Sequence, residues 1–276
     1  MDHPIRDIEV SSRYGVPLTE TFMLHAQSGL SYRILVYKPQ TAAPEAGYPA
    51  LFALDGNSCF GSLAEAMRLQ SRHPQQGLVP GMIVGIGYES DEPFVVNRRF
   101  YDYTLKGRQA GLRPDGTPWP EGGGAEAFLA FIECELKPEL ARRYPMDFRR
   151  QALFGHSLGG LFTLYALAEK PQSFSHYVAG SPSVWWNDYE LLQRMPDLRR
   201  SLREQGLQAK LMIAAGAGEK AAILEGAFRA NELLAGEAGG ELEVDYHLFE
   251  GETHVSVIHP LISRMLRFVF PLQANA

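Results

Sequence analysis

Apolar and polar positions along the chain follow two different periods, which predicts strands interleaved with helices. Residues 19–26 and 31–39 alternate polar and apolar side chains on either side of the turn 27–30, as in a hairpin. Near-continuous apolar runs follow, which is typical of strands buried on both faces of a parallel sheet; they cover residues 48–56, 81–88, 151–155, 176–181 and 209–216. Residues 242–249 alternate again and predict a strand nearer the edge of the sheet.

Helical spacing separates these runs. Residues 124–143 place apolar side chains on one face, and Pro138 within them is expected to kink or break the helix. Further helices are expected directly after Ser157, over about 220–235 and from about Pro260 to Phe268. Alternating strands and helices imply right-handed crossovers. We therefore predict a three-layer α/β sandwich with a mostly parallel central sheet and antiparallel N-terminal strands, in one domain spanning 1–276.

The segment 89–123 breaks this rhythm, because it is rich in Gly and Pro and shows no periodicity. A long irregular loop inside a compact domain usually has a function, so we expect this one on the substrate side. Residues 98–113 contain five basic residues and one acidic residue, Asp102, which gives the segment a net charge of +4. The basic residues are Arg98, Arg99, Lys106, Arg108 and Arg113. The alternative is a solvated loop whose charges bind nothing.

Composition narrows the classes of partner. The chain has 276 residues, 45% of them hydrophobic, which is enough for one large core. Its net charge of −6 argues against nucleic acid or an anionic membrane as a partner. The N-terminus lacks the pattern of an export signal, so a cytoplasmic protein is expected. Neither cysteine has metal-type spacing, and Cys134 falls in a helical pattern where we expect it to pack in the core.

The segment 155–159, Gly-His-Ser-Leu-Gly, fits the G-x-S-x-G motif of a nucleophile elbow. An apolar strand precedes it and an amphipathic helix follows, which is the context that the motif requires. In such an elbow Ser157 takes a strained backbone conformation, and the flanking glycines prevent collisions with the neighbouring strand and helix. The alternative is a tight turn with an unused serine.

A serine hydroxyl needs a base at neutral pH, and in this architecture the acid and the histidine follow the serine in the chain. His254 lies in the loop after strand 242–249 and is the predicted base. His259 is expected to cap the last helix. His156 is expected to face away from the site as a packed or hydrogen-bonded neighbour.

The predicted acid is Glu219, which follows strand 209–216. A carboxylate there can reach the second imidazole nitrogen and fix its tautomer. Asp188, Glu225 and a dyad with no acid remain alternatives. The stretch 216–221 also approximates a G-x-G-x-x-A dinucleotide motif, but the next strand lacks an acidic residue at its end, which argues against nucleotide binding.

Two backbone N–H groups are expected to form the oxyanion hole. One belongs to Leu158, the residue after the nucleophile, and the other to Gly56 or Asn57, in the loop after the third strand.

Six short segments together carry a resemblance to a known family; they are LDGN (54–57), VGIGY (84–88), NRRFYDYT (97–104), GHSLGG (155–160), SPSVWW (181–186) and GETH (251–254). Over roughly 10–270, the chain resembles the putative-esterase family of α/β-hydrolases and, within it, the siderophore trilactone esterases. The resemblance implies Ser157 as nucleophile, His254 as base, and Gly56 or Asn57 with Leu158 in the oxyanion hole. Arg99 matches an arginine that lies beside the family's substrate pocket. Some members work with a Ser–His dyad, so the resemblance adds little support for an acid.

These observations predict a serine esterase that acts on a small-molecule ester, an anionic ferric siderophore being the favoured one. Arg98 and Arg99 would supply planar donors and stacking faces for catechol rings. Trp185 and Trp186 would add aromatic surface at the mouth of the site, unless they pack in the core. No metal or organic cofactor is expected, because any iron arrives with the substrate. The alternatives are a general carboxylesterase, thioesterase or acyltransferase for small acyl groups, and a binding protein that keeps the fold without catalysis.

Overall fold

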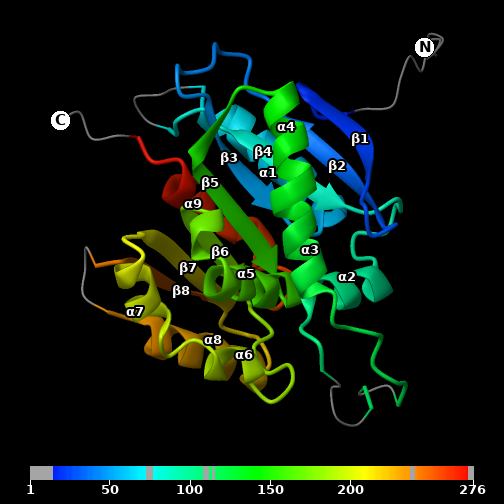
Figure 1. The fold of residues 1–276 in the computed structure, drawn as a ribbon, viewed down its shortest axis with the longest axis vertical. Helices are drawn as coiled ribbons and strands as arrows, with labels where there is room; N and C mark the ends of the chain where they lie inside the picture. The colour runs from blue at the N-terminus through cyan, green and yellow to red at the C-terminus, as the bar shows by residue number, and fades with distance from the viewer. Residues whose placement is uncertain (1–14, 73–76, 108–111, 114–115, 237–239, 273–276) are drawn as a thin grey trace, which may run out of the picture.

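The computed structural model describes residues 15–72, 77–107, 112–113, 116–236 and 240–272, and its strands form one sheet in the order β1-β2-β4-β3-β5-β6-β7-β8 (Figure 1). The bounds are β1 Thr19–His25, β2 Ser31–Tyr37, β3 Tyr48–Ala53, β4 Met82–Gly87, β5 Met146–His156, β6 His176–Gly180, β7 Ala209–Gly216 and β8 Leu242–Phe249. The pairs β1–β2 and β2–β4 are antiparallel, and every later pair is parallel. The predicted sheet, with β8 at its edge, is confirmed.

Strand β3 shows why the central runs are apolar throughout. Successive side chains of a strand point to opposite faces. Phe52 therefore packs into the core on one face, and Leu51 and Ala53 pack into the core on the other. A strand covered on both sides needs an apolar residue at each position, which explains the continuous runs.

Helices cover both faces of the sheet, as Figure 1 shows. On one face, α1 (Gly56–Gln70) and α9 (Ile258–Val269) share a core. The other core receives residues of the remaining helices, which are α2 (Val96–Tyr103), α3 (Ala125–Phe131), α4 (Lys137–Arg143), α5 (Leu158–Glu169), α6 (Glu190–Gln193), α7 (Leu198–Glu204) and α8 (Ala221–Leu234). The predicted three-layer α/β sandwich is confirmed.

Two helices lie where the sequence predicts loops. Residues after Asp55 form the first turn of α1, whose buried residues recur at helical spacing: Cys59, Phe60, Leu63, Ala64 and Met67. The segment 89–123 contains α2, so the prediction that it is irregular throughout was wrong. Of its basic residues, Arg108 lies outside the described part of the chain.

Pro138 breaks the helical pattern as predicted. Because proline lacks an N–H and its ring collides with the carbonyl four residues earlier, the chain takes a π-helical turn, η1 (Ile132–Leu136), directly before α4. Cys134 lies in this turn and is exposed. The prediction that it packs in the core was wrong, because the face carrying Ile132 and Leu136 is the one turned inward.

Candidate active site

Ser157 lies at the corner between β5 and α5. Its backbone angles are φ 61° and ψ −116°, a conformation that residues other than glycine rarely adopt. The surrounding structure holds this conformation: the Ser157 N–H donates to the Gly180 carbonyl (2.8 Å) and the Ser157 carbonyl accepts from the Leu161 N–H (3.0 Å). The strained elbow predicted for Ser157 is confirmed.

The three glycines around the elbow differ in what they require. A Cβ on Gly155 would lie 2.1 Å from the Gly159 carbonyl oxygen, and one on Gly160 would lie 2.8 Å from the Gly180 carbonyl oxygen. A Cβ on Gly159 would meet nothing closer than 3.6 Å, which is ordinary contact. The expectation that both glycines beside the serine avoid a collision therefore holds at Gly155 and is wrong at Gly159.

Three side chains from different loops meet at the elbow. Ser157 Oγ lies 3.0 Å from His254 Nε2, and His254 Nδ1 lies 2.6 Å from Glu219 Oε2. His254 follows β8 and Glu219 follows β7, and these neighbouring strands run parallel to β5. The carboxyl ends of parallel strands lie at one edge of a sheet, which is why residues so far apart in sequence converge.

Burial decreases from the carboxylate to the imidazole. The Glu219 side chain is 0% exposed, whereas that of His254 is 38% exposed. Glu219 Oε1 also accepts hydrogen bonds from Ser181 Oγ (2.5 Å) and the Gly216 N–H (2.8 Å). Burial alone would raise the pKa of Glu219, but the bonds from His254, Ser181 and Gly216 outweigh it and lower the pKa below its ordinary value. An ionised Glu219 accepts the Nδ1–H of His254, which leaves Nε2 free to accept the hydroxyl proton of Ser157.

The other candidate acids lie elsewhere. Asp188 is exposed, in the loop that follows β6. Glu225 pairs with Arg229 along α8. His259 is the second residue of α9, and its Nε2 lies 3.3 Å from Ser62 Oγ rather than capping the helix.

His156 packs against the imidazole of His254, with 4.7 Å between the ring centroids. The expectation that it faces away was wrong, although it is a packed neighbour as expected. It is 5% exposed, and burial lowers its pKa to about 3. The ring beside His254 is therefore neutral at physiological pH.

Two helix N-termini supply the candidate oxyanion donors. Gly56 begins α1 and Leu158 begins α5, and the strands before them, β3 and β5, are parallel neighbours. The first N–H groups of a helix have no acceptor within the helix, so they are available to a developing negative charge. The side chain of Asn57 is engaged otherwise: its Nδ2 donates to the carbonyls of Tyr88 (3.1 Å) and Ser90 (2.7 Å). A cavity of about 210 Å³ lies beside Gly56 and Asn57.

Arg99 forms a two-pronged ion pair with Asp55, at 3.1 Å from Nε and 2.9 Å from Nη2. Its side chain is 11% exposed, and it also donates to the carbonyl of His156 (3.3 Å). Burial by itself lowers the pKa of Arg99, but the Asp55 carboxylate outweighs it and raises the pKa. Arg99 thus joins α2 to the residue before α1 and to the end of β5.

Arg98 is also engaged by the chain itself. It lies 3.5 Å from Asp102, and its guanidinium stacks 5.0 Å from the centre of the Tyr32 ring and 4.9 Å from that of Tyr88. Because both arginines already face carboxylates, the local balance of +4 overstates the positive charge that is open to a ligand.

The two predicted tryptophans differ in exposure. Trp186 is 3% exposed and packs edge-on against Phe100 and Trp119, with centroids 5.5 Å apart in both cases. Trp185 is half-buried and lies 5.8 Å from Trp119. Trp186 is thus a core residue, and Trp185 keeps some open surface. Trp119 was not predicted as part of this cluster, because it lies in a segment without periodicity.

Two serines in the loop after β6 also belong to the site, although neither was predicted from the sequence. Ser181 bonds to Glu219, and Ser183 Oγ lies 3.2 Å from Ser157 Oγ. The available signal was their position, because polar residues directly after a buried strand of a parallel sheet lie at the edge where sites form.

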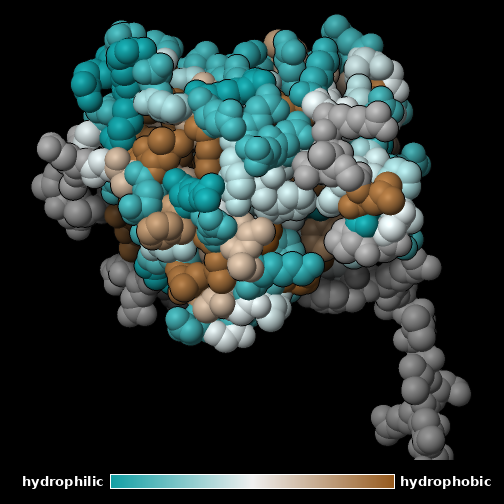
Figure 2. Space-filling view, turned by 90° about the horizontal axis from the view of Figure 1, so that it is seen from below, coloured by the Kyte–Doolittle hydropathy of each residue, from teal (hydrophilic) through white to brown (hydrophobic). Residues whose placement is uncertain are grey.

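No group of three His, Cys, Asp or Glu side chains suited to a metal occurs among the described residues, and within them no helix is long and apolar enough to cross a bilayer. Figure 2 views the side on which α6 and α8 lie in Figure 1, where hydrophobic residues form separate areas among hydrophilic ones.

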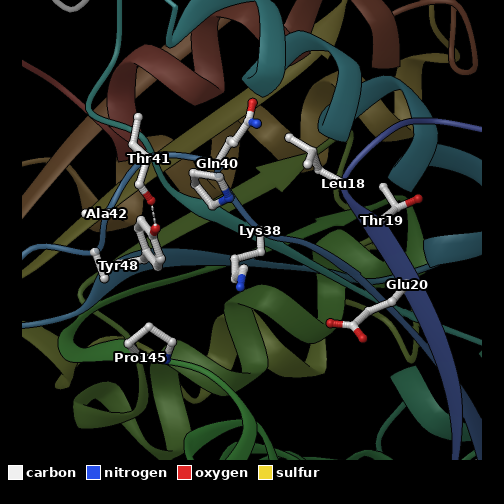
Figure 3. A pocket seen from close by; sticks show the side chains of 11 residues that line it. Leu18, Thr19, Glu20, Lys38, Gln40, Thr41, Ala42, Tyr48 and Pro145 are labelled. Carbon is white, nitrogen blue, oxygen red and sulfur yellow. Dashed lines mark hydrogen bonds between the residues drawn. The ribbon is translucent and has the colours of Figure 1, made fainter.

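A cavity of about 630 Å³ is lined by Tyr48 and Pro145, among other residues. Figure 3 shows these two side chains together with those of Lys38 and Glu20, which also line the cavity. Tyr48 begins β3 and Pro145 directly precedes β5, so this cavity lies at the opposite end of these strands from Ser157.

Comparison with known proteins places the chain among esterases. The family profile described as "Putative esterase" matches residues 26–260. The ferri-bacillibactin esterase BesA of Bacillus subtilis is 42% identical over 265 residues, covering 94% of this chain and 91% of the relative. A siderophore triacetylfusarinine C esterase of Aspergillus fumigatus is 31% identical, covering 92% of this chain and 94% of the relative. The crystal structure of the BES protein from Bacillus cereus matches with a TM-score of 0.88 and 35% identity, covering 95% of this chain and 99% of that one.

Proposed function

Because this chain belongs to the putative-esterase family of α/β-hydrolases, we propose that it is a serine esterase that cleaves the ester bonds of a siderophore through an acyl-enzyme. The observation that carries the mechanism is the contact of Ser157 Oγ with His254 Nε2 at 3.0 Å, with Glu219 behind the imidazole at 2.6 Å. All three residues follow strands of one sheet, which supports a single catalytic domain.

In the acylation step, Ser157 Oγ attacks the ester carbonyl carbon while its proton passes to His254 Nε2. Glu219 holds the imidazole in the required tautomer and stabilises the imidazolium that forms. The carbonyl oxygen becomes an oxyanion, to which the N–H groups of Leu158 and of Gly56 or Asn57 donate hydrogen bonds. The carbon–oxygen bond to the alcohol then breaks, and His254 returns the proton to the leaving oxygen.

Hydrolysis of the acyl-enzyme repeats these steps with water. His254 accepts a proton from the water, which attacks the acyl carbon. The bond to Ser157 Oγ breaks, and the same imidazole protonates that oxygen. The site therefore needs no group beyond its own side chains and two backbone donors.

The named activities of the relatives support a siderophore as the substrate, with its iron entering as part of that substrate. One observation favours a second candidate, a small neutral ester: Arg98 and Arg99 both already face carboxylates of the chain. A neutral substrate does not require free positive charge at the mouth of the site.

The test compares the wild type with Ser157→Ala on a trilactone siderophore, with and without iron, and on short p-nitrophenyl esters. Removing the nucleophile should lower turnover by about 10⁴-fold or more on every substrate that the wild type cleaves. A fluorophosphonate should label the wild type at Ser157 and leave the variant unlabelled. Equal turnover by the two proteins would exclude the mechanism, and cleavage of simple esters alone would favour the neutral substrate.

A further inference from the structure

The loop after β6 brings a second hydroxyl to the nucleophile. Ser183 Oγ lies 3.2 Å from Ser157 Oγ, and Ser183 is 2% exposed. Its backbone is fixed on both sides: the Ser183 N–H donates to the Ser157 carbonyl (3.0 Å), and the Ser183 carbonyl accepts from the Trp186 N–H (3.1 Å). The hydroxyl is thus held against Ser157 by buried backbone.

The hydrogen bonds around Ser157 determine which hydroxyl donates. Glu219 receives the Nδ1–H of His254, so Nε2 carries a lone pair and accepts the hydroxyl proton of Ser157. A serine hydroxyl has one proton to donate and two lone pairs. With the proton of Ser157 directed to His254, the bond between the two serines must run from the Ser183 O–H to Ser157 Oγ.

We propose that Ser183 is a further catalytic residue: its hydroxyl donates a hydrogen bond to Ser157 Oγ and assists the departure of that oxygen when the acyl-enzyme is hydrolysed. This inference rests on the proposed esterase mechanism. In the step concerned, the bond between the acyl carbon and Ser157 Oγ breaks and its electron pair goes to Oγ. The proton that completes the serine hydroxyl comes from His254 Nε2, while Ser183 keeps its own proton and stabilises the developing charge.

The hydrogen bond from Ser183 is expected to accelerate the two half-reactions, acylation and deacylation, to different extents. In the free enzyme, Ser183 already bonds to the neutral hydroxyl of Ser157, so the bond is present before attack as well as during it. In the acyl-enzyme, Oγ is an ester oxygen, which is a poor acceptor, and the bond regains strength only as the oxygen leaves. Only interactions that are stronger in the transition state than in the preceding ground state accelerate a step. Ser183 should therefore accelerate deacylation more than acylation.

The experiment measures the two half-reactions separately in wild type and Ser183→Ala. Release of p-nitrophenol from p-nitrophenyl acetate with enzyme in excess reports acylation, and rapid quenching followed by intact-mass measurement reports decay of the acyl-enzyme. Loss of one hydrogen bond to a developing charge should slow deacylation about tenfold. Acylation should fall by less than about threefold, so the acyl-enzyme accumulates.

Two further variants separate this role from packing. Ser183→Thr keeps the hydroxyl and should restore most of the deacylation rate. Ser175→Ala removes a hydroxyl at the other end of β6, where it donates to the Gln151 carbonyl (3.0 Å), and should leave both half-reactions unchanged. Equal slowing of both half-reactions by Ser183→Ala, or no slowing of deacylation, would overturn the role of Ser183. In either case, ester cleavage by the wild type would still support the proposed esterase function. A wild type that forms no acyl-enzyme at Ser157 would overturn both.

Discussion

Glu219 is the residue on which the sequence gives least guidance and the structure most. From sequence it is the predicted acid because it follows strand 209–216, but Asp188, Glu225 and a dyad with no acid remain alternatives. In the structure it is fully buried and has three donors, from His254, Ser181 and Gly216. A carboxylate so placed is ionised and oriented before any substrate binds.

Replacing Glu219 with Gln should lower kcat by about 10² to 10⁴-fold, because the amide no longer fixes the imidazole tautomer or stabilises the imidazolium. Steady-state kinetics on a p-nitrophenyl ester measures the change. The matched control is Glu225→Gln, which alters a carboxylate on the exposed side of α8 and should leave kcat within about twofold, as for other surface substitutions. If Glu219→Gln retained wild-type kcat, the enzyme would operate as a Ser–His dyad.

Single residues were predictable where a motif or the chain order constrains them. Ser157 follows from the elbow motif, and His254 from its place after the last strand. The position of Ser183 after a buried strand was a usable signal, but its contact with Ser157 was not predictable, nor was the pairing of Arg99 with Asp55, because each contact joins residues that only the folded chain brings together. The orientation of His156 has the same cause, since the loop carrying His254 supplies its neighbour.

Among the elements, strands were more predictable than helices. The expected ranges of β7 and β8 match the observed ones, because continuous or alternating apolar runs have clear limits. Helix α1 was missed although its buried residues recur at helical spacing, because Gly and Ser in its first turns suggest a loop. Asp55, before it, is a residue type that often caps helices, but here it takes a left-handed conformation and its carboxylate pairs with Arg99 instead.

The turn from β5 into α5 makes a sharp prediction about glycine. Gly155→Ala should destabilise the fold by more than about 4 kcal/mol, because the new methyl group would lie 2.1 Å from the Gly159 carbonyl oxygen and backbone would have to move. Gly159→Ala should change the free energy of unfolding by no more than about 1 kcal/mol, since alanine favours a helix and its methyl group has room. Urea unfolding of the two variants measures the difference. Similar stability of both would contradict the close approach at Gly155.

For the whole molecule, buried histidine makes stability depend on pH. Burial lowers the pKa of His156 to about 3, whereas an unfolded chain binds this proton near pH 6.5. Between these values the unfolded state carries a proton that the folded state lacks, so the free energy of unfolding decreases as the pH falls. At pH 5 the loss from this one group is about 2 kcal/mol.

His156→Phe removes the titrating group and keeps a ring beside His254. The fall in the free energy of unfolding between pH 7.5 and pH 5 should then be smaller than in the wild type by about 2 kcal/mol. Urea unfolding at the two pH values measures it, and His25→Phe, at an exposed position of β1, is the control that should leave the fall unchanged. An identical fall in the free energy of unfolding in His156→Phe and the wild type would contradict the lowered pKa of His156 as a source of the pH dependence.

The contrast in exposure between Glu219 and His254 determines where the site can exchange protons with solvent. The side chain of Glu219 has no surface in contact with solvent, whereas part of the His254 imidazole does, so the carboxylate does not exchange protons with bulk solvent directly. Every proton exchanged with the surroundings passes through the imidazole. The attacking water is therefore expected to approach from the solvent-facing side of His254, where the imidazole can accept its proton.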